Sequence, residues 1–123
     1  MKKFKIASVV IASLMVAGNA MAQGTSNSEI TGYVVSIPFQ DPSRTAVFVR
    51  PAGSISNNPS CNTTSRFVFD SNTTFGKQAL ATIMVAQVNG EVLRLAGTGS
   101  CPSSTLSSNS EELRKICTAS GPC

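Results

Sequence analysis

Residues 75–96, FGKQALATIMVAQVNGEVLRLA, decide the fold, because they predict a helix, a turn and a strand in direct succession. Apolar residues recur at helical spacing and predict a helix over residues 75–88; they are Leu80, Ile83, Met84 and Val88. A hydroxyl group at Thr73 or Thr74 can cap the first turn. Gly90 can adopt the left-handed conformation that ends a helix.

Strands are predicted on both sides of this helix. Short runs of β-branched and aromatic residues predict strands over residues 29–37, 45–50 and 66–69, and the first two form a hairpin. After the helix, alternation predicts a strand over residues 91–96, with Leu93 and Leu95 facing inward. Residues 52–65 lack apolar periodicity and predict a long loop.

Residues 111–118 allow either a fifth strand or a helical turn. Leu113 and Ile116 fit helical spacing, but strict alternation also fits, and we favour a strand because a sheet needs a closing edge. The fold class is then mainly β with one helix, in the order β-β-β-α-β-β. This order resembles that of the OB-fold, a five-stranded Greek-key barrel.

The first 22 residues have the pattern of a secretory signal peptide. Lys2, Lys3 and Lys5 precede an apolar run over residues 6–16, and small residues stand at Ala20 and Ala22. Cleavage is predicted between Ala22 and Gln23, which leaves residues 23–123 as a single domain with a flexible start over residues 23–28. The apolar run is shorter than the ~20 residues that span a bilayer, and no second run is long enough. The mature protein is therefore expected to be periplasmic or secreted, without a membrane span.

The basic isoelectric point, about 9.1, reflects the targeting segment. Of the ten Lys and Arg residues, three lie in that segment, which leaves seven against six Asp and Glu and a net charge of +1. A nucleic-acid surface needs clustered cations, and only Arg114 and Lys115 are adjacent. We therefore expect no nucleic-acid partner.

The sequence carries no catalytic signature. Histidine is absent, which removes Ser–His and Cys–His catalysis. Glu111 and Glu112 are neighbours and would point to opposite faces of a strand, while Asp70 is expected to form a surface ion pair with Arg66. Gly97-Thr98-Gly99 starts like a phosphate loop but runs into Ser100-Cys101-Pro102 without a helix, which favours a tight turn. We predict neither an enzyme nor a cofactor site.

Four cysteines, Cys61, Cys101, Cys117 and Cys123, would enter an oxidising compartment and form disulfides. Four cysteines allow three connectivities. Pairing Cys61 with Cys101 would hold the loop over residues 52–65 to the turn after the fourth strand, and Cys117 with Cys123 would then tie back the tail. A metal site is disfavoured because the chain has no His and no CxxC pair.

A family resemblance rests on Phe75-Gly76-Lys77, the amphipathic helix, Asn89-Gly90-Glu91-Val92 and Gly97-Thr98-Gly99-Ser100-Cys101. This pattern is similar to the B subunits of AB5 toxins of the pertussis-like and subtilase-cytotoxin kind, and covers about 40 residues closely. The resemblance implies a disulfide-stapled OB-fold-like domain in which Cys61 pairs with Cys101. It also implies a non-enzymatic module that binds a glycan or a cell-surface receptor and assembles as a ring of five.

A second hypothesis is a structural or adaptor protein of the bacterial envelope without sugar specificity. The near-neutral mature charge favours it, as does the short supply of aromatic residues for stacking on sugars. Tyr33 is the only Tyr, and there is no Trp. The residues that would contact a ligand are not identified by the sequence.

Overall fold

The computed structural model describes residues 23–38, 41–102, 106–118 and 123. The predicted signal peptide, residues 1–22, lies outside the described residues. The described chain forms five strands and one helix: β1 Thr25–Ser36, β2 Ala46–Pro51, β3 Phe67–Asp70, α1 Thr74–Asn89, β4 Val92–Gly97 and β5 Glu111–Thr118. The prediction of a mainly β protein with one helix is therefore confirmed, as is the favoured strand over residues 111–118.

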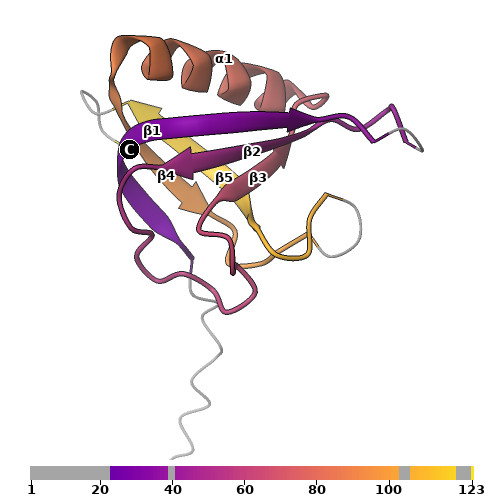
Figure 1. The fold of residues 1–123 in the computed structure, drawn as a ribbon, viewed down its shortest axis with the longest axis horizontal. Coiled ribbons are helices and arrows are strands. Elements are labelled where there is room, and N and C mark those ends of the chain that lie inside the picture. The colour runs from indigo at the N-terminus through magenta and orange to yellow at the C-terminus, as the bar shows by residue number, and fades with distance from the viewer. Residues whose placement is uncertain (1–22, 39–40, 103–105, 119–122) are drawn as a thin grey trace, which may run out of the picture.

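The five strands close in a ring in the order β1-β2-β3-β5-β4, and β4 pairs back onto β1 (Figure 1). All neighbouring pairs are antiparallel except β3 and β5, which are parallel through Phe67↔Glu111 and Val68↔Glu112. Helix α1 lies in the connection between β3 and β4 and packs against β1. β1 and β4, which would be the two outer strands if the sheet were open, are thus paired with each other, and the helix lies beside the ring.

Strand β1 closes the ring because it serves two partners in turn. Residues 25–29 pair with β4, whereas Ile30 and residues 32–36 pair with β2, and the register shifts between Ile30 and Gly32. The prediction of a flexible start over residues 23–28 is wrong for residues 25–28. The run Ser26-Asn27-Ser28 has little strand propensity, and pairing with the distant β4 backbone makes it a strand.

The core fills the space between the ring and α1. Leu93 and Leu95 are buried, as predicted, and so are the inward residues Val47 and Val49 of β2. Phe67 and Phe69 of β3 and Ile83 of α1 complete the centre of the same cluster. The alternation of β2 and β4 thus directs one face of each strand into the core.

Helix α1 begins and ends where the sequence predicts, within one residue. The Thr73 side chain accepts a hydrogen bond from the Gly76 N–H at 2.9 Å, and Gly90 ends the helix with a φ of 64°. The buried face consists of Gly76, Ala79, Ile83 and Ala86. Met84 and Val88, two of the apolar residues at helical spacing, are 45% and 86% exposed, because the helix turns its small residues toward the core instead.

Two disulfides join elements of the ring. Cys61 bonds to Cys101 and holds the long loop between β2 and β3 against the segment after β4. Cys117, in β5, bonds to Cys123. The two disulfides that the sequence predicts are both present, with the pairing that the resemblance implies for Cys61. In the described ranges, no helix is long and apolar enough to cross a membrane.

Candidate functional site

A groove with a volume of about 230 Å³ lies over β1 and β2, next to the residue that precedes β3. We call it the arginine groove. It is lined by Thr31, Gly32, Tyr33, Val34, Phe48, Arg50 and Arg66. The pleat explains part of this set, because Phe48 and Arg50 are two residues apart on β2 and therefore share a face.

Arg66 is held in place by its neighbours in the arginine groove. Its guanidinium carbon lies 4.0 Å from the centroid of the Phe48 ring, which is a cation–π contact. Its Nε donates a hydrogen bond to the Ser110 hydroxyl at 2.9 Å. Ser110 is fully buried and shares a second hydrogen bond with Thr64, also at 2.9 Å. Arg66 is therefore oriented before any ligand arrives.

Arg50 adds a second cation to the arginine groove. Its side chain is exposed, while its backbone carbonyl accepts a hydrogen bond from the Thr31 hydroxyl at 3.0 Å. Desolvation by burial and the positive charge of Arg50 together lower the pKa of Arg66. No Asp or Glu is among the lining residues, all of which lie in the described part of the chain. An anion bound between the two guanidinium groups would relieve their repulsion.

The sequence could have indicated only half of this groove. The alternation along β2 places Phe48 and Arg50 on one face. The local pattern does not place Tyr33 of β1 or Arg66 next to these two residues. They are brought there by the pairing of β1 and β3 with β2. Tyr33 is paired with Val49 and packs against the core, so its ring lies on the opposite face of the sheet from Phe48.

The predicted ion pair between Asp70 and Arg66 is wrong. The Asp70 carboxylate instead accepts hydrogen bonds from the backbone N–H groups of Thr45, at 3.2 Å, and Asn72, at 2.9 Å. It thereby shapes the turn between β3 and α1. Asp70 therefore does not neutralise Arg66, which contacts Phe48 and lines the arginine groove.

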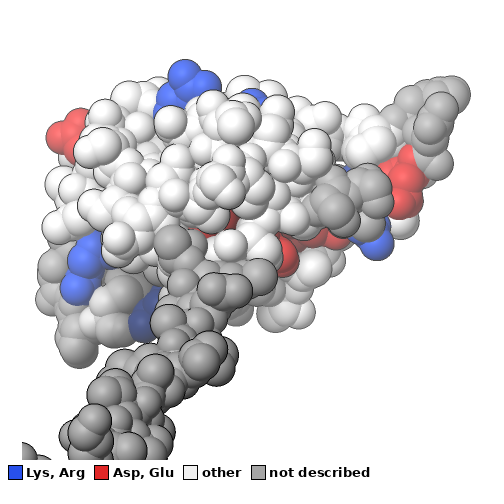
Figure 2. All heavy atoms as spheres, turned by 90° about the horizontal axis from the view of Figure 1, so that it is seen from below, with Lys and Arg blue, Asp and Glu red and all other residues white. Residues whose placement is uncertain are grey.

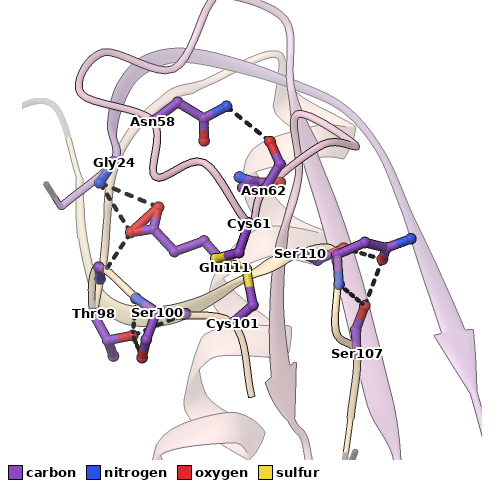
Figure 3. The surroundings of a disulfide bond; sticks show 12 residues. Gly24, Asn58, Cys61, Asn62, Thr98, Ser100, Cys101, Ser107, Ser110 and Glu111 are labelled. Atoms are coloured by element: carbon purple, nitrogen blue, oxygen red, sulfur yellow. Dashed lines mark hydrogen bonds between the residues drawn. A yellow bond between two sulfur atoms is a disulfide. The ribbon is translucent and has the colours of Figure 1, made fainter. Parts of the chain in front are cut away.

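Glu111 and Glu112 have different surroundings. Glu111 is fully buried, and Glu112 is half-buried. The Glu111 carboxylate accepts hydrogen bonds from the N–H groups of Gly24, at 2.9 and 3.1 Å, and Gly99, at 3.0 Å. Figure 3 shows it beside the Cys61–Cys101 disulfide. Its bonds to the backbone give Glu111 a structural role at the junction of β1, β5 and the turn after β4.

The predicted tight turn after β4 is present. Gly99 has a φ of 86°, and the Gly97 N–H donates to the Gly24 carbonyl at 2.9 Å. The N–H of Gly99 is directed at the Glu111 carboxylate, and is therefore not available to a phosphate group. Among the residues that the structure describes, no group of three His, Cys, Asp or Glu side chains could hold a metal ion.

Arg114 and Lys115 flank a second pocket, of about 290 Å³, between α1 and β5. Arg114 donates to the Gln23 side chain at 3.3 Å, and Lys115 donates to the Cys123 carbonyl. Both cations are thus bonded within the chain. Figure 2 shows a face on which the described surface is mostly uncharged, with acidic and basic residues in small separate groups.

No family model, curated protein or solved structure matches this chain. The function must therefore be argued from the geometry of the site itself.

Proposed function

We propose that this chain is an exported, non-enzymatic binding module that holds a glycan bearing a carboxylate group in the arginine groove. The observation that carries the proposal is the convergence of the guanidinium groups of Arg50 and Arg66 with the ring of Phe48 on one groove. The groove combines apolar surface with a few placed polar groups, as small-ligand sites do.

Arg50 and Arg66 would have different roles in binding the carboxylate. A guanidinium group presents a fork of donors that matches a carboxylate. Arg50 has an exposed side chain and can reach outward, while Arg66 is already oriented by Phe48 and Ser110. Such a charged hydrogen bond contributes about 1.5–3 kcal/mol. The ring of Phe48 and the side chain of Val34, its partner on β1, offer apolar surface to the sugar, and Thr31 lies at the same groove.

We further propose that the fold is of the OB type and that the chain is a relative of toxin B subunits. The strand order 1-2-3-5-4, the parallel contact between β3 and β5 and the helix between β3 and β4 support the OB assignment. Export to the periplasm or beyond is supported by the two disulfides. Assembly as a ring of five remains part of this proposal.

The test is binding of the oxidised mature protein to a panel of glycans that end in a carboxylate-bearing sugar, each matched to its neutral counterpart. Arg50→Gln removes one cation from the groove, and the exposed side chain forms no hydrogen bond or ion pair with the described residues that the substitution would break. Lys77→Gln, an exposed position on α1, removes the same charge elsewhere. We expect Arg50→Gln to weaken binding by roughly 10- to 100-fold and Lys77→Gln to leave it unchanged.

Retention of no glycan by the folded, disulfide-bonded protein would reject this function and leave the envelope adaptor as the better hypothesis. Equal binding of acidic and neutral glycans would reject the role of the two arginines. Equal losses for both variants would show that the overall charge, and not the arginine groove, attracts the ligand.

A further inference from the structure

Strand β5 contains a bulge at Arg114. Leu113 pairs with Gly97 of β4 and Lys115 pairs with Ala96, so two steps along β5 correspond to one step along β4. Arg114 is the extra residue and has no pairing partner on β4. A bulge of this kind interrupts the alternation of a strand and redirects side chains.

The bulge brings two consecutive cations to one pocket. Leu113 is buried and Ile116 packs against the core, three residues apart instead of the two of a regular strand. Between them, Arg114 and Lys115 are both exposed, and both line the pocket of about 290 Å³ between β5 and α1. In a regular strand Lys115 would point to the same side as Leu113, into the core. We call this cavity the bulge pocket.

Helix α1 supplies the other wall of the bulge pocket. Phe75, Gln78, Ala79 and Thr82 line it and share one face of the helix, because they are spaced by three and four residues. The Phe75 ring is 39% exposed and makes an edge-to-face contact with the buried Phe69 ring, with 6.3 Å between the centroids. The bulge pocket therefore has a fixed aromatic surface opposite its two cations.

Both cations keep hydrogen-bond donors for a ligand. Within the described residues, neither forms an ion pair with an Asp or Glu side chain, and no Asp or Glu lines the bulge pocket. Arg114 donates one N–H to the Gln23 side chain at 3.3 Å, and Lys115 donates one to the Cys123 main-chain oxygen. A guanidinium group has five N–H donors and an ammonium group has three, so most of them have no partner in the described chain.

We propose that the bulge pocket binds a small organic phosphate, with its phosphate group on Arg114 and Lys115 and its apolar body against Phe75 and Ile116. A phosphate monoester carries a charge of about −1.5 to −2 and three acceptor oxygens, so one group can bridge two adjacent cations. The volume of the pocket is near the lower end of the range for ligand sites, about 300–1,000 Å³, and suits a body of a single ring. Glycan binding is not needed for this site, because no lining residue is shared with the arginine groove.

The experiment titrates the oxidised mature protein with phenyl phosphate and follows the backbone amide signals by NMR. Inorganic phosphate alone and phenol alone are the two comparison ligands. Arg114→Gln removes the guanidinium group at an exposed position, and Lys115→Gln replaces it should that variant fail to fold, as judged by circular dichroism and a free-thiol count. Lys77→Gln is the matched control, because Lys77 is exposed on α1 outside the lining of the bulge pocket.

We expect phenyl phosphate to shift the amide signals of residues 78–82 and 114–116. It should bind roughly tenfold more tightly than inorganic phosphate, because its ring buries apolar surface against Phe75. Arg114→Gln should weaken binding roughly tenfold, because a charged hydrogen bond is lost, and Lys77→Gln should leave it unchanged.

Shifts confined to residues 31–34 and 48–50 would place the ligand in the arginine groove and overturn the proposal. Equal binding of phenyl phosphate and inorganic phosphate would overturn it too, as would an unchanged affinity of the Arg114→Gln protein. Phosphatidylcholine vesicles with and without phosphatidic acid separate a soluble phosphate from a lipid head group. Binding to the acidic vesicles that phenyl phosphate does not compete with would assign the cations to a membrane surface and reject the small ligand.

Discussion

The carboxylate of Glu111, at the start of β5, accepts hydrogen bonds from the backbone N–H of Gly24, 87 residues earlier in the chain. The same carboxylate accepts from Gly99, so one buried side chain joins the start of β1, the turn after β4 and β5. A buried carboxylate without such donors would be costly. These donors explain why an acidic residue is tolerated where the ring closes.

Replacing Glu111 by Gln should destabilise the fold. The amide oxygen can take the place of Oε1, which accepts from both N–H groups, but the NH₂ group then replaces Oε2, 3.1 Å from the Gly24 nitrogen, and two donors face each other. We expect a loss of about 1–3 kcal/mol, and a fall in melting temperature of about 4–8 °C for each kcal/mol in a domain of this size. Thermal unfolding followed by circular dichroism under non-reducing conditions measures it.

Glu112→Gln is the matched control for this change, because Glu112 is the half-buried neighbour on the same strand. We expect its melting temperature to stay close to that of the wild type. Equal shifts for the two variants would show that overall charge, and not the hydrogen bonds of Glu111, determines the effect.

Replacing Gly97 by Ala should also destabilise the fold, by overpacking. A Cβ at Gly97 would collide with the buried Glu111 carboxylate, and one at Gly32 would meet nothing within 4 Å. We expect Gly97→Ala to lose about 1–3 kcal/mol and Gly32→Ala to be neutral or to gain up to about 1 kcal/mol. Denaturant unfolding of both variants gives the comparison, and a Gly97→Ala protein as stable as the wild type would contradict the close approach.

The two disulfides should contribute unequally to stability. Cys61–Cys101 closes a loop with a sequence separation of 40, and Cys117–Cys123 one of only 6. The chain-entropy estimate gives about 4 kcal/mol for the first and about 2 kcal/mol for the second. Removing each pair by double Cys→Ala substitution and measuring denaturant unfolding tests this order. A larger loss for the Cys117–Cys123 pair would mean that native contacts, and not loop closure, dominate.

Removing the helix cap should lower the free energy of unfolding by less than Glu111→Gln or Gly97→Ala does. The Thr73 hydroxyl accepts from the Gly76 N–H and donates to the Asp70 carbonyl, both at 2.9 Å. We expect Thr73→Ala to lose about 1 kcal/mol, measured by thermal unfolding. Thr74→Ala, at the first residue of α1, is the control. If it lost as much as Thr73→Ala, helix propensity and not capping would be the cause.

Local patterns in the sequence determined the elements that depend on near neighbours. Thr73 and Gly90 mark the ends of α1 because caps act within one turn. Alternation marks β4 and the inward positions Leu93 and Leu95, because a strand has a period of two. The four cysteines could be assigned to disulfides from the expected compartment, although the residues alone left three connectivities open.

Only the tertiary structure decided the features that join distant segments. The polar residues 25–28 form a strand because β4 supplies their backbone partners. Met84 and Val88 face outward because Ala79 and Ala86 pack against the core in their place. Such pairings depend on backbone groups far away in the chain, which neither propensity nor periodicity records.

The arginine groove and the surroundings of the buried Glu111 also depend on contacts between segments that are distant in the sequence. Arg66 and Phe48 come together through the pairing of β3 with β2, and Ser110, the residue before β5, orients Arg66. Glu111 lies in residues 111–118, a charged segment for which the sequence alone allows either a strand or a helical turn. On a strand it shares a face with Leu113, two residues later. The ring brings its carboxylate to Gly24 and Gly99, and closure of that ring, a non-local event, determines both the site and its support.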